Sequence, residues 1–302
     1  MQPVQRFLMS VLGMVVLAAC TADAPSPTAT PEPTPSPSPS PTESLEAELL
    51  DRRWTVLFVG TDLNAAREER GEPPNADALM LVSLSADQSE LTLVSLPRDT
   101  VDVPLADGGV WERKINALYL DEGIDTLVGA METLFDVPID GHVVLDMDDF
   151  TRLVDAVGGV EVAPDEPIED PIVNLDLDAG TQEIDAATAN GYVRTRVDKD
   201  YGRMGRQQEV LLAIAERLVD PETDVDVRSL AENLDSLETD LPLDEIPTLL
   251  ELARRATDAE VRRLLIEPPL ITFEGDRGDG RGYILEADVE AIRDEVGELI
   301  RD

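Results

Sequence analysis

The chain has 302 residues, with 24 lysines and arginines against 64 aspartates and glutamates, and a formal net charge of −40. Such a charge repels polyanions and argues against a nucleic acid partner. A single cysteine, Cys20, and a single histidine, His142, exclude an internal disulfide and a cysteine- or histidine-rich zinc site, and argue against a Ser-His-Asp triad.

The first segment is predicted to be an export signal. Arg6 precedes an apolar run from Phe7 to Ala19, whose thirteen residues are fewer than the roughly 20 that span a bilayer. The run ends in Leu17-Ala-Ala-Cys20, which resembles the bacterial lipobox, where the cysteine becomes lipidated. We therefore expect residues 1–19 to be a lipoprotein signal peptide and Cys20 to be the lipidated N-terminus.

Residues 20–48 are predicted to be a tether that follows the lipidated cysteine. Eight prolines lie between Pro25 and Pro41, among serines and threonines, so this segment cannot bury apolar surface. In polyproline II conformation, at about 3.1 Å per residue, it reaches roughly 70 Å. We expect the remaining residues, 49–302, to form one domain, anchored as a lipoprotein to the outer face of the bacterial cytoplasmic membrane.

Strands and helices alternate along the predicted domain. Apolar runs bounded by turn residues predict strands at residues 54–60, 78–84, 91–96, 142–146, 160–162, 192–196 and 262–266. Apolar positions at helical spacing predict helices at residues 123–135, 149–156, 185–190, 200–218, 228–237, 246–255 and 286–300, with Asp200 as an N-cap. This order favours an α/β fold with α-β-α layers, in which helices flank a central mixed sheet.

Basic residues are concentrated in one short stretch. Five of the 24 fall within thirteen consecutive positions, namely Arg194, Arg196, Lys199, Arg203 and Arg206. Arginine forks match phosphate oxygens geometrically, so the stretch indicates a local anion site in an acidic protein. Arg194 and Arg196 are two residues apart, and in an extended segment they would point to the same side.

Carboxylates and one arginine follow or precede the first three predicted strands. Asp62 comes just after the first strand, Asp77 just before the second, and Arg98 and Asp99 at the end of the third. If these strands are adjacent, the side chains converge at one edge, where two carboxylates suit Mg²⁺ (or Mn²⁺) that shares its shell with phosphate. Because the sequence has no GxxxxGK[ST] and no GxGxxG, nucleotide chemistry has no support.

Together these motifs resemble the LytR–CpsA–Psr family. The resemblance runs from Gly60 to Gln208 in family order. It rests on Gly60-Thr-Asp62, Asp77-Ala-Leu-Met-Leu, Ser95-Leu-Pro-Arg-Asp99, Lys114-Ile-Asn-Ala-Leu-Tyr119, Val157-Gly-Gly-Val-Glu161, Tyr192-Val-Arg-Thr-Arg196 and Asp200-Tyr-Gly-Arg-Met-Gly-Arg-Gln-Gln208.

The resemblance implies a metal-dependent phosphotransferase. Such proteins transfer glycopolymers, such as teichoic acids, from a polyprenyl-pyrophosphate carrier to peptidoglycan and form a phosphodiester. The polyprenyl tail lies in an apolar tunnel between sheet and helices. Here we expect the tunnel to draw on the helix at residues 124–135 and on apolar strand faces.

Individual roles follow from the matched positions. The resemblance implies Asp62 and Asp77 as metal ligands for Mg²⁺ or Mn²⁺. It implies catalytic roles at the pyrophosphate for Arg98, Asp99, Arg194 and Arg196. Further substrate-binding residues are Lys114, Asn116, Arg203, Arg206 and Gln207.

Two departures from the family leave alternatives open. The family usually has an arginine where this chain has Asn75, and Arg67 or Arg70 in the preceding loop are candidates to replace it. Family members also usually have a transmembrane anchor where this chain has Cys20. The missing arginine keeps a non-catalytic polyprenyl-phosphate-binding lipoprotein as an alternative function. A polyprenyl-pyrophosphate phosphatase, which would use the same site with water as the acceptor, is the other alternative.

Overall fold

The computed structural model describes residues 50, 52–64, 67, 69–71, 73–223, 225, 227–234 and 237–300. The predicted signal peptide, the lipidation site at Cys20 and the tether lie outside the described residues. Within the described part of the chain, no helix combines the length and the apolar character needed to cross a membrane.

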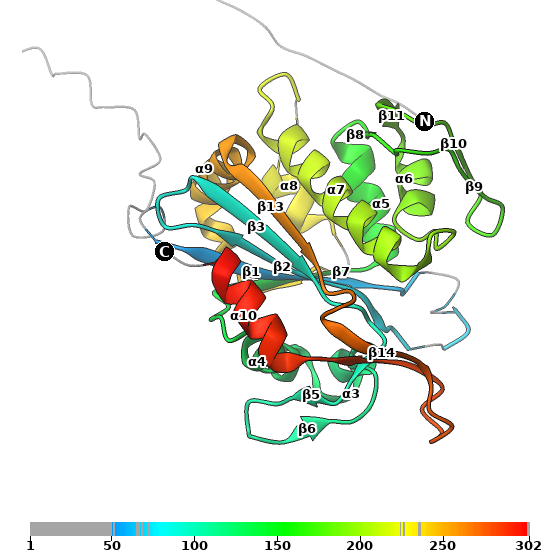
Figure 1. Cartoon of the computed structure of the whole chain (residues 1–302). Coiled ribbons are helices and arrows are strands. Elements are labelled where there is room, and N and C mark those ends of the chain that lie inside the picture. The colour runs from blue at the N-terminus through cyan, green and yellow to red at the C-terminus, as the bar shows by residue number, and fades with distance from the viewer. Residues whose placement is uncertain are drawn as a thin grey trace, which may run out of the picture. The chain divides into compact units, whose positions relative to one another are not determined.

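A six-stranded mixed sheet forms the centre of the domain (Figure 1). The strand order is β12-β7-β1-β2-β3-β13; β1 pairs in parallel with β7, β3 pairs in parallel with β13, and the other neighbours are antiparallel. The strands are β1 (Trp54–Thr61), β2 (Ala76–Leu84), β3 (Glu90–Ser95), β7 (Gly141–Leu145), β12 (Glu238–Thr239) and β13 (Glu260–Leu265). The first three predicted strands are thus adjacent. This adjacency is the condition under which the polar residues at their ends can form one site.

Helices cover both faces of this sheet (Figure 1). One face carries α3 (Leu118–Glu122), α4 (Ile124–Phe135) and α10 (Val289–Leu299). The opposite face carries α5 (Met147–Ala156), α6 (Ala186–Tyr192), α7 (Lys199–Val219), α8 (Val227–Glu232) and α9 (Ile246–Asp258). The predicted fold class, a mixed central sheet flanked by helices, is confirmed.

Strict alternation along β1 explains why helices cover both faces. Leu57 and Val59 belong to the core formed with α4 and α10, whereas Trp54 and Phe58 belong to a separate core on the α7 and α9 side. Successive strand side chains point to opposite faces, so a strand that is apolar throughout is stable only when both faces are covered.

Smaller elements complete the domain. A 3₁₀ turn, η1 (Ile115–Ala117), precedes α3, and a second, η2 (Leu243–Glu245), precedes α9. Short two-stranded pairs are formed by β5 (Val103–Pro104) with β6 (Val110–Trp111), β8 (Val160–Val162) with β11 (Gln182–Ile184), and β9 (Ile168–Asp170) with β10 (Leu175–Leu177). A three-stranded sheet contains β4 (Thr100–Val101), β14 (Ile271–Asp276) and β15 (Tyr283–Ala287).

Several predicted elements are wrong in detail. Residues 192–196 are the end of α6 and a loop, because the backbone N–H groups of Arg194 and Thr195 bond to the carbonyl of Gly191. The predicted helix at residues 286–300 begins only at Val289, where the Asp288 side chain accepts from the N–H of Ala291. The predicted helix at residues 228–237 ends at Glu232.

Asp200 does not cap α7. The helix begins at Lys199, and its N-cap residue is Asp198. The Asp200 carboxylate instead accepts from Arg203, one turn further along the helix. Its charge is therefore directed at the arginine cluster.

Candidate functional site

A cavity of about 780 Å³ lies between the sheet and the helices of the α7 side. Most of its wall is apolar and comes from β1, β2, β7, α5, α7 and α8. Among the apolar lining residues are Phe58, Met80, Val143, Leu145, Phe150, Leu153, Leu211, Ile214, Ala215, Leu218 and Leu230. The volume falls in the range of small-molecule binding sites.

The same cavity has a charged region, which we call the polar end. The charged and amide side chains of the lining are Asp62, Asn64, Arg67, Asp77, Asp146, Asp170, Arg194, Arg196, Arg203 and Gln207. Most of them come from the ends of β1 and β2 with the loop after β1, from the loop after α6 and from the first three turns of α7. An apolar cavity with four arginines among its charged lining suits an amphipathic ligand with an anionic head.

The ends of β1 and β2 are shaped by a close backbone approach. A Cβ atom added at Gly60 would lie 3.1 Å from the Cβ of Ala78, the residue opposite it on β2. The register of the pair then shifts between Gly60 and Thr61, which is a β-bulge. Bulges redirect side chains at sheet ends, and here Asp62 follows directly after the bulge.

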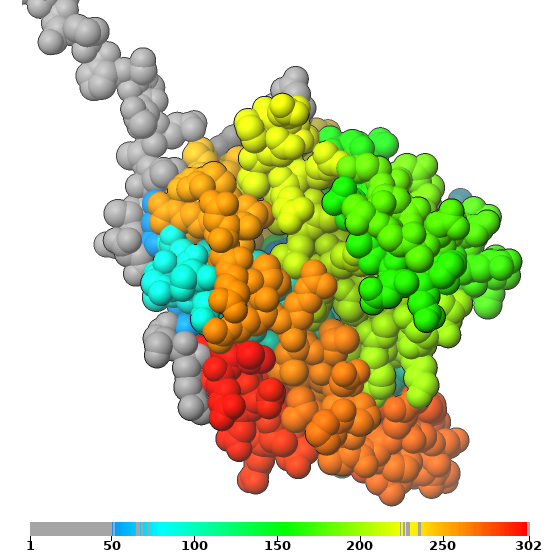
Figure 2. Space-filling view, turned by 45° about the horizontal axis from the view of Figure 1, so that its top comes forward, coloured from blue at the N-terminus to red at the C-terminus, as the bar shows by residue number. Residues whose placement is uncertain are grey.

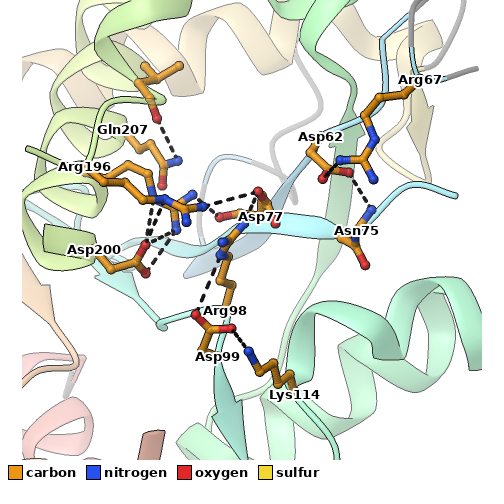
Figure 3. Close-up of polar contacts among 12 residues, drawn as sticks. Asp62, Arg67, Asn75, Asp77, Arg98, Asp99, Lys114, Arg196, Asp200 and Gln207 are labelled. Carbon is orange, nitrogen blue, oxygen red and sulfur yellow. Dashed lines mark hydrogen bonds and ion pairs between the residues drawn. The ribbon is translucent and has the colours of Figure 1, made fainter. Parts of the chain in front are cut away.

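Asp77 lies at the centre of the arginines (Figure 3). Its Oδ2 atom accepts a hydrogen bond from Arg98 and lies 3.7 Å from Nη2 of Arg196. Arg203 donates to the Asp77 main-chain carbonyl at 2.8 Å. Three guanidinium groups from three separate segments therefore converge on one residue.

Asp200 is a second carboxylate of this network. It lies 2.9 Å from Arg203 Nη2 and 3.6 Å from Arg196 Nε. The pKa of Arg196 is nevertheless lowered, first by burial and then by the positive charges of Arg98 and Arg203. At Arg196, burial and the two neighbouring guanidinium groups outweigh the two carboxylates, so an anion bound beside this side chain would stabilise its charge.

Arg98 is supported from the side opposite Asp77. Its Nε atom is 3.9 Å from Asp99, and Asp99 is 2.8 Å from the ammonium group of Lys114 (Figure 3). Asn116 donates its backbone N–H to the Arg98 carbonyl at 3.2 Å. None of these four residues is among the described residues that line the cavity. Asp99 and Asn116 contact Arg98 directly and Lys114 contacts Asp99, so these three residues support Arg98 in its contact with Asp77.

Asp62 and Arg67 form a separate pair at the polar end (Figure 3). Arg67 donates to Asp62 Oδ2, and the backbone N–H of Asn75 donates to Asp62 Oδ1 at 2.8 Å. Of the two arginines that could replace the family arginine missing at Asn75, Arg67 lines the cavity and Arg70 does not.

The polar end has two carboxylates of the kind that magnesium binds. Asp62 and Asp77 both line it, and Asp77 Oδ1 is buried without a hydrogen-bond partner. Magnesium often uses only one or two protein carboxylates and completes its octahedron with phosphate and water. Among the described residues, no three or more histidine, cysteine or acidic side chains are grouped as ligands, so the protein alone would not complete a shell.

The loop between α6 and α7 presents Arg194 and Arg196. Both line the cavity, and they do so from a loop and not from the predicted strand. Gln207 also lines the cavity and donates to the Val193 carbonyl at 3.2 Å.

Arg206 does not lie at the polar end, contrary to the prediction. Its side chain is 6 % exposed and donates to the carbonyls of Tyr192 and Thr195, at 2.9 and 2.6 Å, and to the carboxylate of Asp198. It thereby fastens the loop that carries the two exposed arginines to α7. The side chain satisfies buried carbonyls that no helix or strand pairs.

Residues 124–135, which we expected to contribute to an apolar tunnel, do not line this cavity. Leu127, Ala130 and Met131 of α4 are completely buried in the core on the opposite face of the sheet. Periodicity identified an amphipathic helix correctly but could not say which face it covers. The cavity wall comes instead from α5, α7 and α8, whose apolar residues the sequence shows only as ordinary core positions.

A buried glutamine fixes the position of α7 over the sheet. Gln208 is fully buried, and its amide donates to Ser95 Oγ at 2.9 Å and to the Leu264 carbonyl at 3.2 Å. These contacts join α7 to β3 and β13. They fix the distance between α7 and the sheet, and with it the positions of Arg203 and Gln207 on the same helix.

Known proteins share this architecture. A model of the LytR_cpsA_psr family matches residues 26–288. The chain is 39 % identical over 150 residues to the probable cell wall biosynthesis protein LcpB of Corynebacterium glutamicum, covering 49 % of this chain and 35 % of that protein. It is 27 % identical over 237 residues to the polyisoprenyl-teichoic acid–peptidoglycan teichoic acid transferase TagV of Bacillus subtilis, covering 74 % and 59 %. The chain thus spans only part of these relatives.

Solved structures agree with the sequence relatives. The crystal structure of B. subtilis TagV matches with a TM-score of 0.64 and 26 % identity, over 83 % of this chain and 98 % of that one. A structure of TagT bound to LIIa-WTA has a TM-score of 0.64 at 22 % identity, over 83 % and 92 %, and shares the fold.

Proposed function

Because this chain belongs to the LytR–CpsA–Psr family, we propose that it transfers a glycopolymer from a polyprenyl-pyrophosphate carrier to peptidoglycan. The observation that carries the proposal is the apolar cavity with an arginine-rich end. A polyprenyl tail would occupy the apolar part, and the pyrophosphate would lie at the polar end. Relatives named as teichoic acid transferases support this assignment.

In this proposal the arginines bind the pyrophosphate. Arg194, Arg196 and Arg203 line the polar end, and Arg67 adds a fourth guanidinium from the opposite side, where the family arginine is missing. Charge-assisted contacts to phosphate oxygens are strongest in such a partly buried setting. Gln207 adds a neutral donor. Arg98 holds Asp77 in place through its hydrogen bond, and Asp99, which is paired with Lys114, supports Arg98.

The proposed reaction exchanges one P–O bond for another. The oxygen of an acceptor sugar hydroxyl bonds to the phosphorus that carries the polymer, and the bridging P–O bond of the pyrophosphate breaks. Polyprenyl phosphate leaves, and the hydroxyl proton passes to a base. Positive groups at the polar end stabilise the charge that develops on the leaving phosphate.

We further propose Asp62 and Asp77 as the ligands of a Mg²⁺ or Mn²⁺ ion. A bound divalent cation would neutralise pyrophosphate charge at this end of the cavity. The buried, unpaired Oδ1 of Asp77 supports the proposal, since such an oxygen is costly unless a ligand contacts it.

The test is a transfer assay with the mature chain, a polyprenyl-pyrophosphate-linked polymer and peptidoglycan. We expect a phosphodiester product that requires a divalent cation, and a loss of at least about a hundredfold in Asp77→Asn, which is nearly isosteric. Free polymer phosphate without attachment would identify a phosphatase. Binding without turnover would identify a carrier protein. Activity indifferent to a chelator would exclude the metal.

For the location of the enzyme we propose a lipid anchor at Cys20, on the outer face of the cytoplasmic membrane. The proposal rests on the lipobox-like ending of the apolar run. Cys20→Ala should abolish labelling with a fatty-acid probe and release the domain from membranes. Unchanged membrane retention would favour an uncleaved anchor.

A further inference from the structure

Two tyrosines and a glutamate form a surface cluster that is not part of the cavity lining. Tyr201 lies in the first turn of α7, Glu274 in β14 and Tyr283 at the start of β15. Tyr283 is 49 % exposed. Figure 2 shows the hairpin that contains β14 and β15, in deep orange, on the surface of the domain.

A single carboxylate joins the two tyrosines. Glu274 accepts from the Tyr201 hydroxyl through Oε2, at 3.3 Å, and from the Tyr283 hydroxyl through Oε1. The carboxylate has further lone pairs, and Glu274 is itself exposed, so it retains capacity to accept from a ligand. The cluster therefore presents aromatic rings next to a solvent-accessible hydrogen-bond acceptor.

The hairpin is fixed at both ends, so the cluster is held in position. At its base, β15 pairs in parallel with β4, and the N–H of Leu285 donates to the Asp99 carbonyl at 3.0 Å. Near its tip, Arg281 forms an ion pair with Asp102 at 3.0 Å. A binding platform on an anchored hairpin loses little conformational freedom when it takes a ligand.

The cluster borders the proposed phosphate site. Tyr201 directly follows Asp200, the partner of Arg196 and Arg203. Tyr283 is two residues from Leu285, which is bonded to Asp99. Burial, the Glu274 hydrogen bond and the negative charges of Glu274, Asp99 and Asp200 raise the pKa of Tyr283 to about 12. Both tyrosines thus lie beside carboxylates of the site but outside the cavity.

The cluster is separate from the proposed donor site. In the proposed function the cavity holds the lipid and its pyrophosphate, and none of Tyr201, Glu274 and Tyr283 is among the residues that line it. An acceptor hydroxyl must approach the phosphate from outside the donor pocket. Sugar rings pack their C–H faces on aromatic side chains and donate hydroxyl hydrogens to carboxylates.

We propose that Tyr201, Glu274 and Tyr283 form an acceptor subsite that binds a sugar ring of a peptidoglycan glycan strand next to the phosphate site. The inference rests on the proposed transfer function and adds the location of its acceptor. Tyr283 supplies the exposed ring, Glu274 accepts from sugar hydroxyls, and Tyr201 orients Glu274.

The test compares Tyr283→Leu, Tyr283→Phe and Glu274→Gln in the mature chain. Two quantities are measured: the acceptor and donor KM in transfer, and direct binding of uncrosslinked strands of alternating N-acetylglucosamine and N-acetylmuramic acid by calorimetry. Tyr283→Leu should raise the acceptor KM and weaken strand binding about threefold to tenfold, with the donor KM unchanged. Tyr283→Phe keeps the ring and should stay within about twofold, and Glu274→Gln, which cannot unfold the hairpin by loss of volume, should resemble Tyr283→Leu.

Glu238→Gln is the matched control. Glu238 accepts from Tyr119 at 2.7 Å in the same kind of pair, on β12, an edge strand of the six-stranded sheet, whereas β14 and β15 belong to the three-stranded sheet. This variant should leave strand binding and both KM values unchanged. A comparable loss there would show that breaking any tyrosine–glutamate pair acts through stability, and the subsite would fall.

The outcomes separate the subsite from the proposed function. Normal transfer with an unchanged acceptor KM in Tyr283→Leu would overturn the subsite and leave the function standing. A raised donor KM in that variant would place the cluster in the donor site and also overturn it. Strand binding that depends on Tyr283, in a protein that transfers no polymer, would support the subsite while the proposed function fails. Absence of both binding and transfer would overturn both.

Discussion

The two faces of the central sheet differ in how completely they are filled. On the α4 and α10 face, side chains such as Leu57, Leu127 and Met131 are wholly buried in one continuous core. On the α7 face, Phe58 and Leu211 border a cavity of about 780 Å³. The same strands therefore border a packed core on one side and a cavity on the other. Close packing stabilises a domain, and an apolar cavity gives up part of that energy, which a lipid tail would restore in the proposed function.

The largest difference is expected from removing one leucine on each face. Leu127→Ala should lower the free energy of unfolding by about 2–5 kcal/mol, because the rigid core cannot collapse around the lost volume. Leu211 is only partly buried and borders the cavity, so Leu211→Ala loses fewer packing contacts and should cost less, about 1 kcal/mol. Urea unfolding of both variants measures the two values. Equal costs would show that the α7 face is packed as tightly as the other.

Replacing one arginine on each face compares the two faces in their effect on transfer. Arg196→Lys keeps the charge at the polar end but loses the planar fork, so transfer should fall about tenfold to hundredfold, equivalent to ~1.5–3 kcal/mol, with an unchanged melting temperature. Arg293→Lys is the control, since Arg293 on α10 donates to the Thr133 carbonyl at 2.6 Å on the filled face. Transfer should be unaffected by it. A fully active Arg196→Lys would contradict the phosphate role.

Substitutions that add volume should also distinguish the two faces of the sheet. Ala130→Phe inserts a ring into the filled core and should destabilise the domain by about 1–3 kcal/mol. Ala215→Phe places the same ring at the cavity wall and should leave the melting temperature unchanged or raise it, while weakening binding of a long prenyl phosphate. Thermal unfolding and binding of a fluorescent prenyl phosphate measure these effects. Destabilisation by both variants would indicate that the cavity closes in solution.

Much of the fold could be predicted from local patterns. The first three strands, the α4 periodicity and the arginine-rich start of α7 are visible because their signals lie within a few consecutive residues. One error occurs where a distant segment decides the local structure. Residues 192–196 favour a strand by composition, yet Arg206 holds them as a loop by satisfying two of their carbonyls.

The candidate site was predictable as a set of residues but not as an arrangement. Asp62, Asp77, Arg194, Arg196, Arg203 and Gln207 all line the polar end. Arg98, Asp99, Lys114 and Asn116 are not among the lining residues. Arg206 and Asp200 have positions that composition could not show, because each depends on a partner in another segment.

The sequence by itself determined the alternation of elements, the acidic surface and the short stretch that collects arginines, since these follow from residue identity and spacing. Only the tertiary structure decided which face of the sheet stays hollow. Apolar residues of α4 and α7 look alike along the chain, and their difference arises from what packs opposite them. Periodicity reports that a side chain points inward, and only the assembled layers decide whether it meets another side chain or a cavity.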